Sequence, residues 1–391
     1  MSFLLAVTML ACGADAASTE GLIIPLFKTN VETYRVFGQE HPGPYKHPAS
    51  ITQLANGDFY IAYYGGENEY DDNTAVYGAR GRFSGGGEGD AGNDSEKEPG
   101  PPRRLPQPPG RPGWRWEYPV VIADTPFQGD GNPVVWQAPD GLVWLFYVNR
   151  LGETWCTSRV KAKISKDGAE TWSDSFMLTW EEGTMVRGQP IVLNNGDYLL
   201  PLYKEMGGDR EFTSPETSCF FLRYTPSTKT WTESSRIHSA KGNEQAQVVQ
   251  LTDDHLFCFT RRSGGYEPTT DGWMIRSDSF DGGKTWSEGV NTEVPNCNAA
   301  VELIKLANGD LMLIYNDNMN DRTPLTVAVS KDGGETWPFK RDIAGGNNDF
   351  AYPYAVQGKD GKIYLVYTTN GRTTIMLAVF DEAAVTEYTN E

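Results

Sequence analysis

The sequence is poor in cysteine, in histidine and in positive charge. Its 391 residues include 5 cysteines and 4 histidines, and 52 acidic residues outnumber 34 Lys and Arg, for a formal net charge of −18. Such a chain repels nucleic acid and anionic membranes, so we exclude both as partners. The cysteines lack metal-ligand spacing, so we expect no metal and no cofactor. Acidic loops leave a structural calcium ion open.

Helical periodicity and long apolar runs are also missing. No stretch sustains a helical pattern, which argues against a helical fold. The short apolar run at residues 3–12 cannot span a bilayer, and no other segment resembles a transmembrane helix. An A-x-A pattern follows it at residues 14–16, which predicts a signal peptide at residues 1–17 and a secreted or periplasmic protein. The alternative is a lipoprotein anchor at Cys12, although Met9 is a poor start for that motif.

The sequence is rich in repeats. The octapeptide SFDGGKTW at residues 279–286 returns as SKDGGETW at 330–337 and as SKDGAETW at 165–172. Short polar side chains bind the backbone of a tight turn, glycine accepts positive φ, and tryptophan packs inward. The pattern S-x-D-x-G-x-T-W therefore predicts a recurring hairpin.

A second repeat consists of two apolar stretches joined by a turn of Asn-Gly or Asp-Gly type. It recurs six times, around residues 57, 141, 196, 254, 309 and 361. Each copy predicts two hairpin-linked strands. Six units of roughly 55 residues, each long enough for four strands, predict an all-β fold, a six-bladed β-propeller. We expect residues 18–391 to form one domain, with residues 82–112, rich in Gly, Pro and charge, as a mobile surface insertion.

The octapeptides resemble the Asp boxes of the sialidase superfamily, also called bacterial neuraminidase repeats, whose fold is a six-bladed propeller. The resemblance spans about residues 40–385. In that superfamily the Asp boxes lie on the rim away from the active site. The resemblance therefore implies a structural role for Asp167, Asp281 and Asp332.

Functional residues are expected where the six blades converge. The innermost strands begin seven to ten residues before each turn, at residues 46–48, 132–133, 187–189, 244–247, 298–302 and 352–354. The second strands return to the same side at residues 67–72, 149–150, 204–205, 261–262, 316–322 and 370–372. Both sets are polar although apolar strands flank them. Buried polar groups need partners, so we expect many of them to bind one another or a ligand.

The resemblance also implies roles for particular residues. Sialidases bind a substrate carboxylate with three arginines, which suit it through bidentate hydrogen bonds. Their nucleophile is a tyrosine activated by a glutamate, and an aspartate is the acid/base. Tyr352 matches the tyrosine, Arg322 the third arginine, and Arg261 or Arg262 the second. Asp71 or Asp72 matches the aspartate, with Glu67 and Glu69 equally well placed.

Two positions depart from the sialidase pattern. The first arginine is replaced by Lys46 and His47, and the better register places Gln245, beside Glu244, on the activating glutamate. Histidine suits proton transfer at neutral pH. The catalytic candidates are Tyr352, His47, Glu69, Asp72 and Glu244. The substrate-binding candidates are Arg187, Gln189, Gln245, Gln247, Arg261, Arg262, Arg322 and Lys46.

Three functions fit these residues. The first is a sialidase-like exo-glycosidase that removes a terminal acidic or polar sugar from a glycan. The second is a lyase acting on a uronic acid, because arginine can hold the uronate while His or Tyr moves protons. The third is a non-catalytic glycan-binding propeller, since fold does not imply function.

Overall fold

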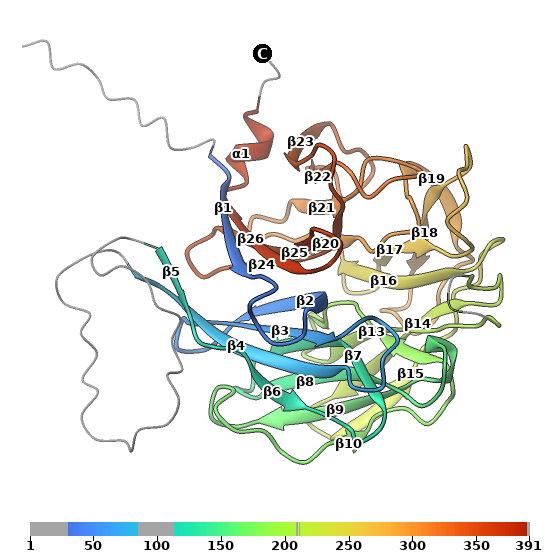
Figure 1. Cartoon of the computed structure of the whole chain (residues 1–391). Coiled ribbons are helices and arrows are strands. Elements are labelled where there is room, and N and C mark those ends of the chain that lie inside the picture. The colour runs from blue at the N-terminus through green and yellow to red at the C-terminus, as the bar shows by residue number, and fades with distance from the viewer. Residues whose placement is uncertain (1–29, 85–112, 209, 211, 389–391) are drawn as a thin grey trace, which may run out of the picture.

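The computed structural model describes residues 30–84, 113–208, 210 and 212–388. It confirms the predicted all-β fold: six antiparallel sheets of four or five strands form the six blades of a propeller (Figure 1). The expected signal peptide at residues 1–17 lies outside the described residues. So does most of the expected insertion, because residues 82–84 continue a strand and only 85–112 are not described.

The strands follow the chain order blade by blade. Blade 1 contains β2 (Tyr45–Gln53), β3 (Phe59–Gly66), β4 (Ala75–Ser84), β5 (Gly113–Trp116) and β6 (Val120–Ala123). Blade 2 contains β7 (Gly129–Gln137), β8 (Val143–Arg150), β9 (Arg159–Ser165) and β10 (Phe176–Met177). Blade 3 contains β11 (Thr184–Val186), β12 (Ile191–Val192), β13 (Tyr198–Lys204), β14 (Ser218–Thr225) and β15 (Thr230–Glu233).

Blade 4 contains β16 (Asn243–Gln250), β17 (Leu256–Arg262), β18 (Trp273–Ser279) and β19 (Val290–Pro295). Blade 5 contains β20 (Glu302–Lys305), β21 (Leu311–Tyr315), β22 (Leu325–Ser330) and β23 (Phe339–Ala344). Blade 6 contains β24 (Phe350–Gln357), β25 (Ile363–Thr369), β26 (Thr374–Phe380) and β1 (Glu32–Phe37). A 3₁₀ turn (Trp155–Thr157) and helix α1 (Ala383–Thr386) complete the described elements. Within this part of the chain, no helix has the length and apolarity that a membrane crossing requires.

The ring is closed by the N-terminal strand. Strand β1 pairs antiparallel with β26 and becomes the outermost strand of blade 6, so the blue and red ends of the chain lie side by side in Figure 1. Phe37 of β1 contacts Trp116 of blade 1, with ring centroids 6.0 Å apart. The first described strand therefore joins the last blade to the first.

The Asp boxes form the turns between the third and fourth strands of their blades. In the box at residues 330–337, Asp332 accepts hydrogen bonds from the Ser330 hydroxyl (2.7 Å) and the Thr336 backbone N–H (3.0 Å). The hydroxyl of Thr336 donates to the same carboxylate, and these bonds hold the pKa of Asp332 well below its usual range. The carboxylate is occupied by its own turn, as a structural role requires.

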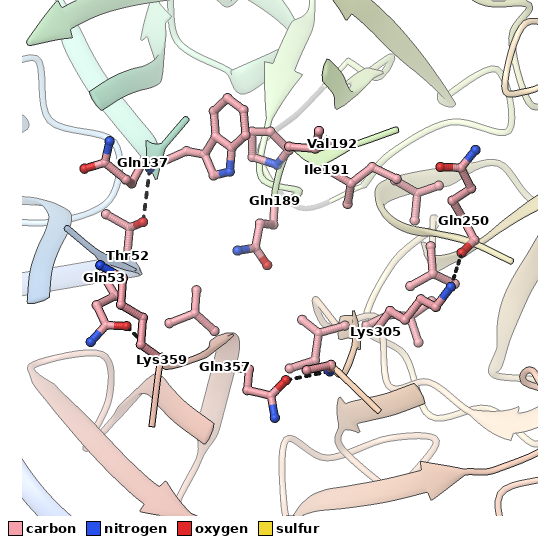
Figure 2. Close-up of a pocket in the computed structure, with 18 of the residues that line it drawn as sticks. Thr52, Gln53, Gln137, Gln189, Ile191, Val192, Gln250, Lys305, Gln357 and Lys359 are labelled. Carbon is pink, nitrogen blue, oxygen red and sulfur yellow. Dashed lines mark hydrogen bonds between the residues drawn. The ribbon is translucent and has the colours of Figure 1, made fainter. Parts of the chain in front are cut away.

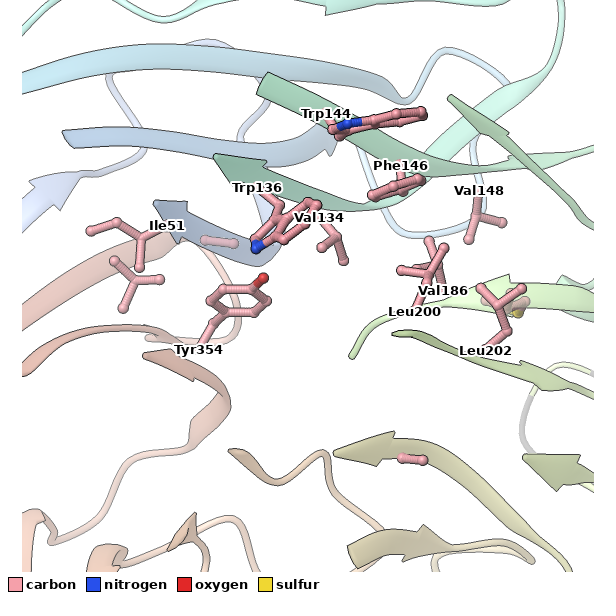
Figure 3. Close-up of a cluster of buried hydrophobic side chains, with 14 of the residues drawn as sticks. Ile51, Val134, Trp136, Trp144, Phe146, Val148, Val186, Leu200, Leu202 and Tyr354 are labelled. Atoms are coloured by element: carbon pink, nitrogen blue, oxygen red, sulfur yellow. The ribbon is translucent and has the colours of Figure 1, made fainter. Parts of the chain in front are cut away.

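Each Asp-box tryptophan packs onto the preceding blade. The ring of Trp286 stacks on Phe221 of blade 3 at 4.4 Å, and that of Trp337 lies 5.9 Å from Phe259 of blade 4. Figure 3 shows the same kind of contact deeper in the fold, where Phe146 and Val148 of β8 face the leucines of β13. Burial of large aromatic side chains between blades stabilises the ring.

The four cysteines in the described part of the chain are free thiols. Three of them, Cys219, Cys258 and Cys297, are buried, and Cys156 is half-buried. Cross-links between these residues therefore do not contribute to the stability of the ring.

Glutamine side chains link successive blades where the inner strands end. The carbonyl oxygen of each accepts a backbone N–H from the neighbouring turn: Gln137 from Ala55, Gln250 from Asn194, Gln357 from Ala307 and Gln53 from Lys359. Figure 2 shows this ring of amides around the axis. At the corresponding positions blade 3 has Val192 and blade 5 has Lys305, whose ammonium group donates to Gln250 O at 2.9 Å. In blade 2 the turn residue that matches Ala55 is Pro139, which has no N–H to donate.

We expect Gln250→Ala to lower the free energy of unfolding by about 1–2 kcal/mol. The substitution leaves the Asn194 N–H without its acceptor and removes the 3.2 Å bond from the Gln250 amide to Asp253 O. Urea unfolding measures the effect. The matched control is Val192→Ala at the equivalent position of blade 3, which we expect to change stability by less than about 0.5 kcal/mol. Equal losses in the two variants would contradict the proposed role of the amide.

Candidate functional site

The two mouths of the propeller axis differ in chemistry. A cavity of about 580 Å³ lies where the inner strands end, and four of the glutamines that line it are engaged by turns. The opposite mouth, where the inner strands begin, contains a cavity of about 450 Å³ and an adjoining pocket of about 50 Å³. We call this mouth the funnel. Its lining is rich in arginine, glutamate and tyrosine and includes a histidine, so the candidate site lies here.

Bulges in the inner strands position the funnel side chains. Pairing in blades 1, 2, 4 and 6 skips two residues, for example between Glu244 and Gln247 and between Ala351 and Tyr354. Tyr352 (φ 54°) and Gln245 (φ 57°) lie in these bulges with left-handed backbone conformations. Positive φ is unfavourable for such residues and is maintained only by the surrounding structure. The strained backbone places both side chains in the funnel.

Tyr352 is the centre of the hydrogen-bond network. Its hydroxyl oxygen accepts a bond of 2.8 Å from Arg261 Nη1 and one of 3.3 Å from Gln245 Nε2. Arg261 is fixed in turn, because its Nε donates to Asn298 Oδ1 (2.7 Å) and its Nη2 to the Tyr266 hydroxyl (2.8 Å). Two side-chain donors therefore converge on the Tyr352 oxygen, and the charged one is held in place by its other hydrogen bonds.

Four arginines lie near Tyr352: Arg261, Arg322 and Arg372 line the funnel pockets, and Arg187 lies beneath, with its guanidinium carbon 5.5 Å from the ring centre. The guanidinium carbon of Arg322 lies 5.5 Å from the centre of the Tyr352 ring and that of Arg261 lies 6.0 Å from it. Arg372 shares the larger cavity with Arg322 and Tyr352. It occupies the turn between β25 and β26 with φ 64°. The funnel thus carries a concentration of positive charge in a chain whose net charge is −18.

His47 lies against Tyr352, with ring centroids 4.1 Å apart. It is buried, its Nδ1 shares a 2.9 Å hydrogen bond with the Thr368 hydroxyl, and its Nε2 makes no hydrogen bond in the described structure. Burial, followed by the charges of four nearby arginines, holds the pKa of His47 well below its usual range. The ring is therefore neutral at physiological pH.

Three carboxylates line the funnel pockets, and their partners differ. Glu69 forms a 2.6 Å ion pair with Arg372 and accepts a 2.7 Å bond from the Tyr45 hydroxyl. Glu244 is 3.8 Å from Arg261 Nε, and burial raises its pKa. Glu205 is also buried, and burial together with the charge of Glu244 raises its pKa to about 8.

Arg187 lies beneath the funnel and does not line it. It is 1 % exposed, and its Nη2 donates to the carbonyl oxygens of Tyr352 (3.1 Å) and Pro353 (2.7 Å). Arg187 therefore supports the bulge that carries Tyr352. Burial lowers the pKa of Arg187, and the charge of the fully buried Glu302 is the main influence that raises it.

Several residues proposed from the sequence lie away from both funnel pockets. The ammonium group of Lys46 is buried and donates to the carbonyl oxygens of His41 and Gly43. Arg262 points away from Arg261, with its Nε bound to Asn296 O at 3.0 Å. The side chain of Asp72 is 71 % exposed and pairs with Arg150.

The remaining two candidates are glutamines. Gln189 lines the cavity at the opposite mouth, and its side chain points toward the axis in Figure 2. Gln247 is buried and accepts a 3.2 Å hydrogen bond from the Gln189 backbone N–H. The structure therefore brings together His47, Glu69, Glu244, Gln245, Arg261, Arg322 and Tyr352. It separates Lys46, Asp72, Arg187, Gln189, Gln247 and Arg262 from the funnel lining.

The structure adds residues that sequence reasoning did not select. Glu205 and Arg372 both lie at strand ends that the repeat pattern assigns to the funnel side, so a signal for them existed. Tyr266 and Arg210 come from long loops, for which the repeats predict nothing. In the described ranges no group of three or more His, Cys, Asp or Glu side chains is arranged to hold a metal ion.

Comparison with known proteins relates this architecture to others. A family model described as a BNR repeat-like domain matches residues 57–365. A Hadza microbial sialidase has a TM-score of 0.67 at 16 % identity, over 90 % of this chain and 68 % of its own. NanB sialidase from Streptococcus pneumoniae has a TM-score of 0.67 at 11 % identity, over 90 % and 70 %.

A protein of unknown function from Dyadobacter fermentans is similar over nearly its whole length. Its TM-score is 0.66 at 16 % identity, over 89 % of this chain and 98 % of its own. No curated protein sequence matches the chain. At these identities the structural likeness establishes the propeller fold and leaves the activity to be argued from the funnel.

Proposed function

The chain belongs to the BNR repeat-like family of the sialidase superfamily, and from this premise we propose that it hydrolyses the bond to a terminal, acidic sugar of a glycan. One observation carries the proposal: the guanidinium groups of Arg261, Arg322 and Arg372 gather around the hydroxyl and ring of Tyr352. Clustered arginines bind carboxylate by charge-assisted hydrogen bonds. A terminal sugar that carries a carboxylate would place its reactive carbon near Tyr352.

The charge distribution supports an anionic substituent. The overall charge of −18 repels an anion at long range, so binding requires a local positive cluster. Arg322 retains a donor for a ligand, because its Nη1 makes no hydrogen bond to the described residues while its Nη2 donates to Asn298 O at 3.3 Å. A buried donor without a partner is costly, and a bound carboxylate would satisfy it.

In the proposed reaction, the Tyr352 hydroxyl first loses its proton to water, and the phenolate so formed attacks the anomeric carbon. The hydrogen bonds from Arg261 and Gln245 stabilise the phenolate charge. A glycosyl–tyrosine intermediate forms as the leaving oxygen takes a proton from an acid in the pocket. Water then attacks the same carbon, and Tyr352 departs again as phenolate.

A uronic-acid lyase is the second candidate, because Gln245 cannot accept a proton from Tyr352 as a glutamate would. His47, with its ring 4.1 Å from that of Tyr352, is placed to take part in proton transfer instead. Tyr352 would remove the proton beside the carboxylate, and the arginines would stabilise the charge that develops. Elimination yields an unsaturated sugar that absorbs ultraviolet light and contains no oxygen from water.

We expect Arg322→Leu to lower kcat/KM for acidic glycosides roughly 100-fold, because a charge-assisted hydrogen bond contributes about 1.5–3 kcal/mol. Steady-state kinetics on sialosides and glucuronides measures the loss. The control is Arg159→Leu, which removes one positive charge outside both funnel pockets, where Arg159 lies 3.7 Å from Glu182. An unchanged kcat/KM in the Arg322 variant would refute the proposal that Arg322 binds the substrate carboxylate.

A further inference from the structure

Of the carboxyl groups in the funnel, Glu205 is the one without a cationic partner. Among the described residues, no Lys, Arg or His nitrogen lies within ion-pair distance of it, and its Oε1 accepts a hydrogen bond of 3.8 Å from the Cys156 thiol. Glu69 is held as a carboxylate by Arg372, and Glu244 faces Arg261. A proton donor must carry its proton before the reaction, and ion pairing with arginine opposes that state.

The backbone of Glu205 is fixed by a neighbouring turn. Its N–H donates to Gly183 O at 2.8 Å, and Gly183 has φ +81°. A Cβ at position 183 would lie 2.5 Å from the carbonyl oxygen of Glu205, so only glycine permits this approach. Glu205 follows β13 directly and lines the same pocket as Tyr352 and Glu244. These contacts fix the backbone from which the Glu205 side chain enters the candidate site.

From these contacts we propose that Glu205 is the acid that protonates the leaving oxygen, an assignment that rests on the glycosidase function proposed above. The first step breaks the bond between the anomeric carbon and the leaving oxygen. The electron pair goes to that oxygen, which takes the Glu205 proton, while the Tyr352 phenolate bonds to the carbon. In the second step water attacks the carbon, gives its proton to the Glu205 carboxylate and releases the phenolate. Atoms and charges balance at each step.

The charged groups around Glu205 agree with this role. Burial raises its pKa most, the charge of Glu244 raises it further, and Glu69 adds to this, while Arg261 and the Cys156 thiol act in the opposite direction. The pKa reaches about 8, so the group is protonated at neutral pH. An efficient general acid has a pKa near the working pH, which Glu205 meets.

The test compares Glu205→Gln with wild type on two substrates that share a terminal sugar. One is a methylumbelliferyl glycoside, whose leaving group needs little protonation, and the other is the matching oligosaccharide, whose leaving group needs it. Sialic acid and glucuronic acid supply the two substrate pairs. We expect the variant to lose roughly 10²–10⁴-fold in kcat/KM on the oligosaccharide and to retain most of its kcat/KM on the aryl glycoside, because kcat/KM reports the step in which the leaving oxygen departs. The alkaline limb of the kcat/KM pH profile should also disappear. Glu69→Gln, which removes the ion pair with Arg372, should lower kcat/KM on both substrates by the same factor.

An infrared measurement separates this assignment from the activity itself. The difference between the wild-type and Glu205→Gln spectra, in which the Glu302 carboxyl cancels, should contain a protonated carboxyl band that disappears as the pH rises through about 8. Absence of that difference band overturns the assignment, and so does an equal loss of kcat/KM on both substrates in the Glu205 variant. A wild-type protein that cleaves none of the probes while showing the band refutes the proposed hydrolysis and, with it, the catalytic use of this proton.

Discussion

Tyr352→Phe is expected to lower kcat roughly 10³-fold or more while leaving the fold intact. The substitution removes the one oxygen on which Arg261 Nη1 (2.8 Å) and Gln245 Nε2 (3.3 Å) converge. Loss of a nucleophile removes the covalent route altogether, so the residual rate reflects binding alone. In a lyase the same oxygen would be the base, and the loss would be of similar size.

The fold survives this change because the surrounding groups keep other partners. Arg261 retains its bonds to Asn298 and Tyr266, so the free energy of unfolding should fall by no more than about 1 kcal/mol. Tyr354→Phe is the matched control: this tyrosine is also buried but lies outside both funnel pockets. A kcat close to that of wild type in Tyr352→Phe would show that the Tyr352 hydroxyl is neither the nucleophile nor the base.

Glu302→Gln is expected to change how stability depends on pH. Glu302 begins β20 and is fully buried beneath the funnel. Burial raises its pKa from 4.5 to about 8, although Arg187 and the Ala355 backbone N–H act to lower it. In the unfolded chain the carboxyl ionises near its ordinary pKa, whereas the folded protein retains the proton up to about pH 8.

The protonated carboxyl therefore contributes stability that is fully present below about pH 4.5 and is lost as the pH rises to about 8. A glutamine at this position has no proton to lose. The free energy of unfolding of Glu302→Gln, relative to that of wild type, should therefore increase by about 4–5 kcal/mol between pH 4 and pH 9. Urea unfolding of both proteins across this range measures the difference, in which all other titrating groups cancel. A pH-independent difference would show that Glu302 ionises normally in the folded state.

The repeats predicted the fold because they reflect local chemistry. Asp-box turns and hairpin turns each require particular residues, and six hairpin repeats of about 55 residues match a six-bladed propeller. Strand β1 escaped prediction, since residues 32–37 carry no repeat and pair with β26 across the length of the chain. Such long-range pairing leaves no local mark in a sequence.

The funnel was predicted at the level of chain segments and only partly at the level of side chains. The choice between Arg261 and Arg262 depends on strand register, which pairs Arg261 with Glu244 across β16 and β17. The bulge between Lys46 and Ala49 decides that His47 points inward and Lys46 does not. In blade 3 the inner strand is broken into β11 and β12, and Arg187 lies between them. Strand periodicity therefore does not predict whether its side chain lines the funnel or is buried beneath it.

Two further residues depended on contacts between blades. Arg372 reaches the funnel because a left-handed turn places its guanidinium 2.6 Å from Glu69. Glu205 acquires its unusual environment from Cys156 of blade 2 and Glu244 of blade 4. Neither environment follows from the residues adjacent in sequence.

Incubation with sialylated and uronate-capped oligosaccharides in oxygen-18 water tests the proposed function most directly. The products are read by mass spectrometry, with Tyr352→Phe as the control. Hydrolysis through the arginine-lined funnel predicts one oxygen-18 atom in a released acidic sugar and none with the variant. An unlabelled product lighter by one water would contradict hydrolysis in favour of elimination. Binding without any product would contradict both and leave the funnel as a glycan-recognition site.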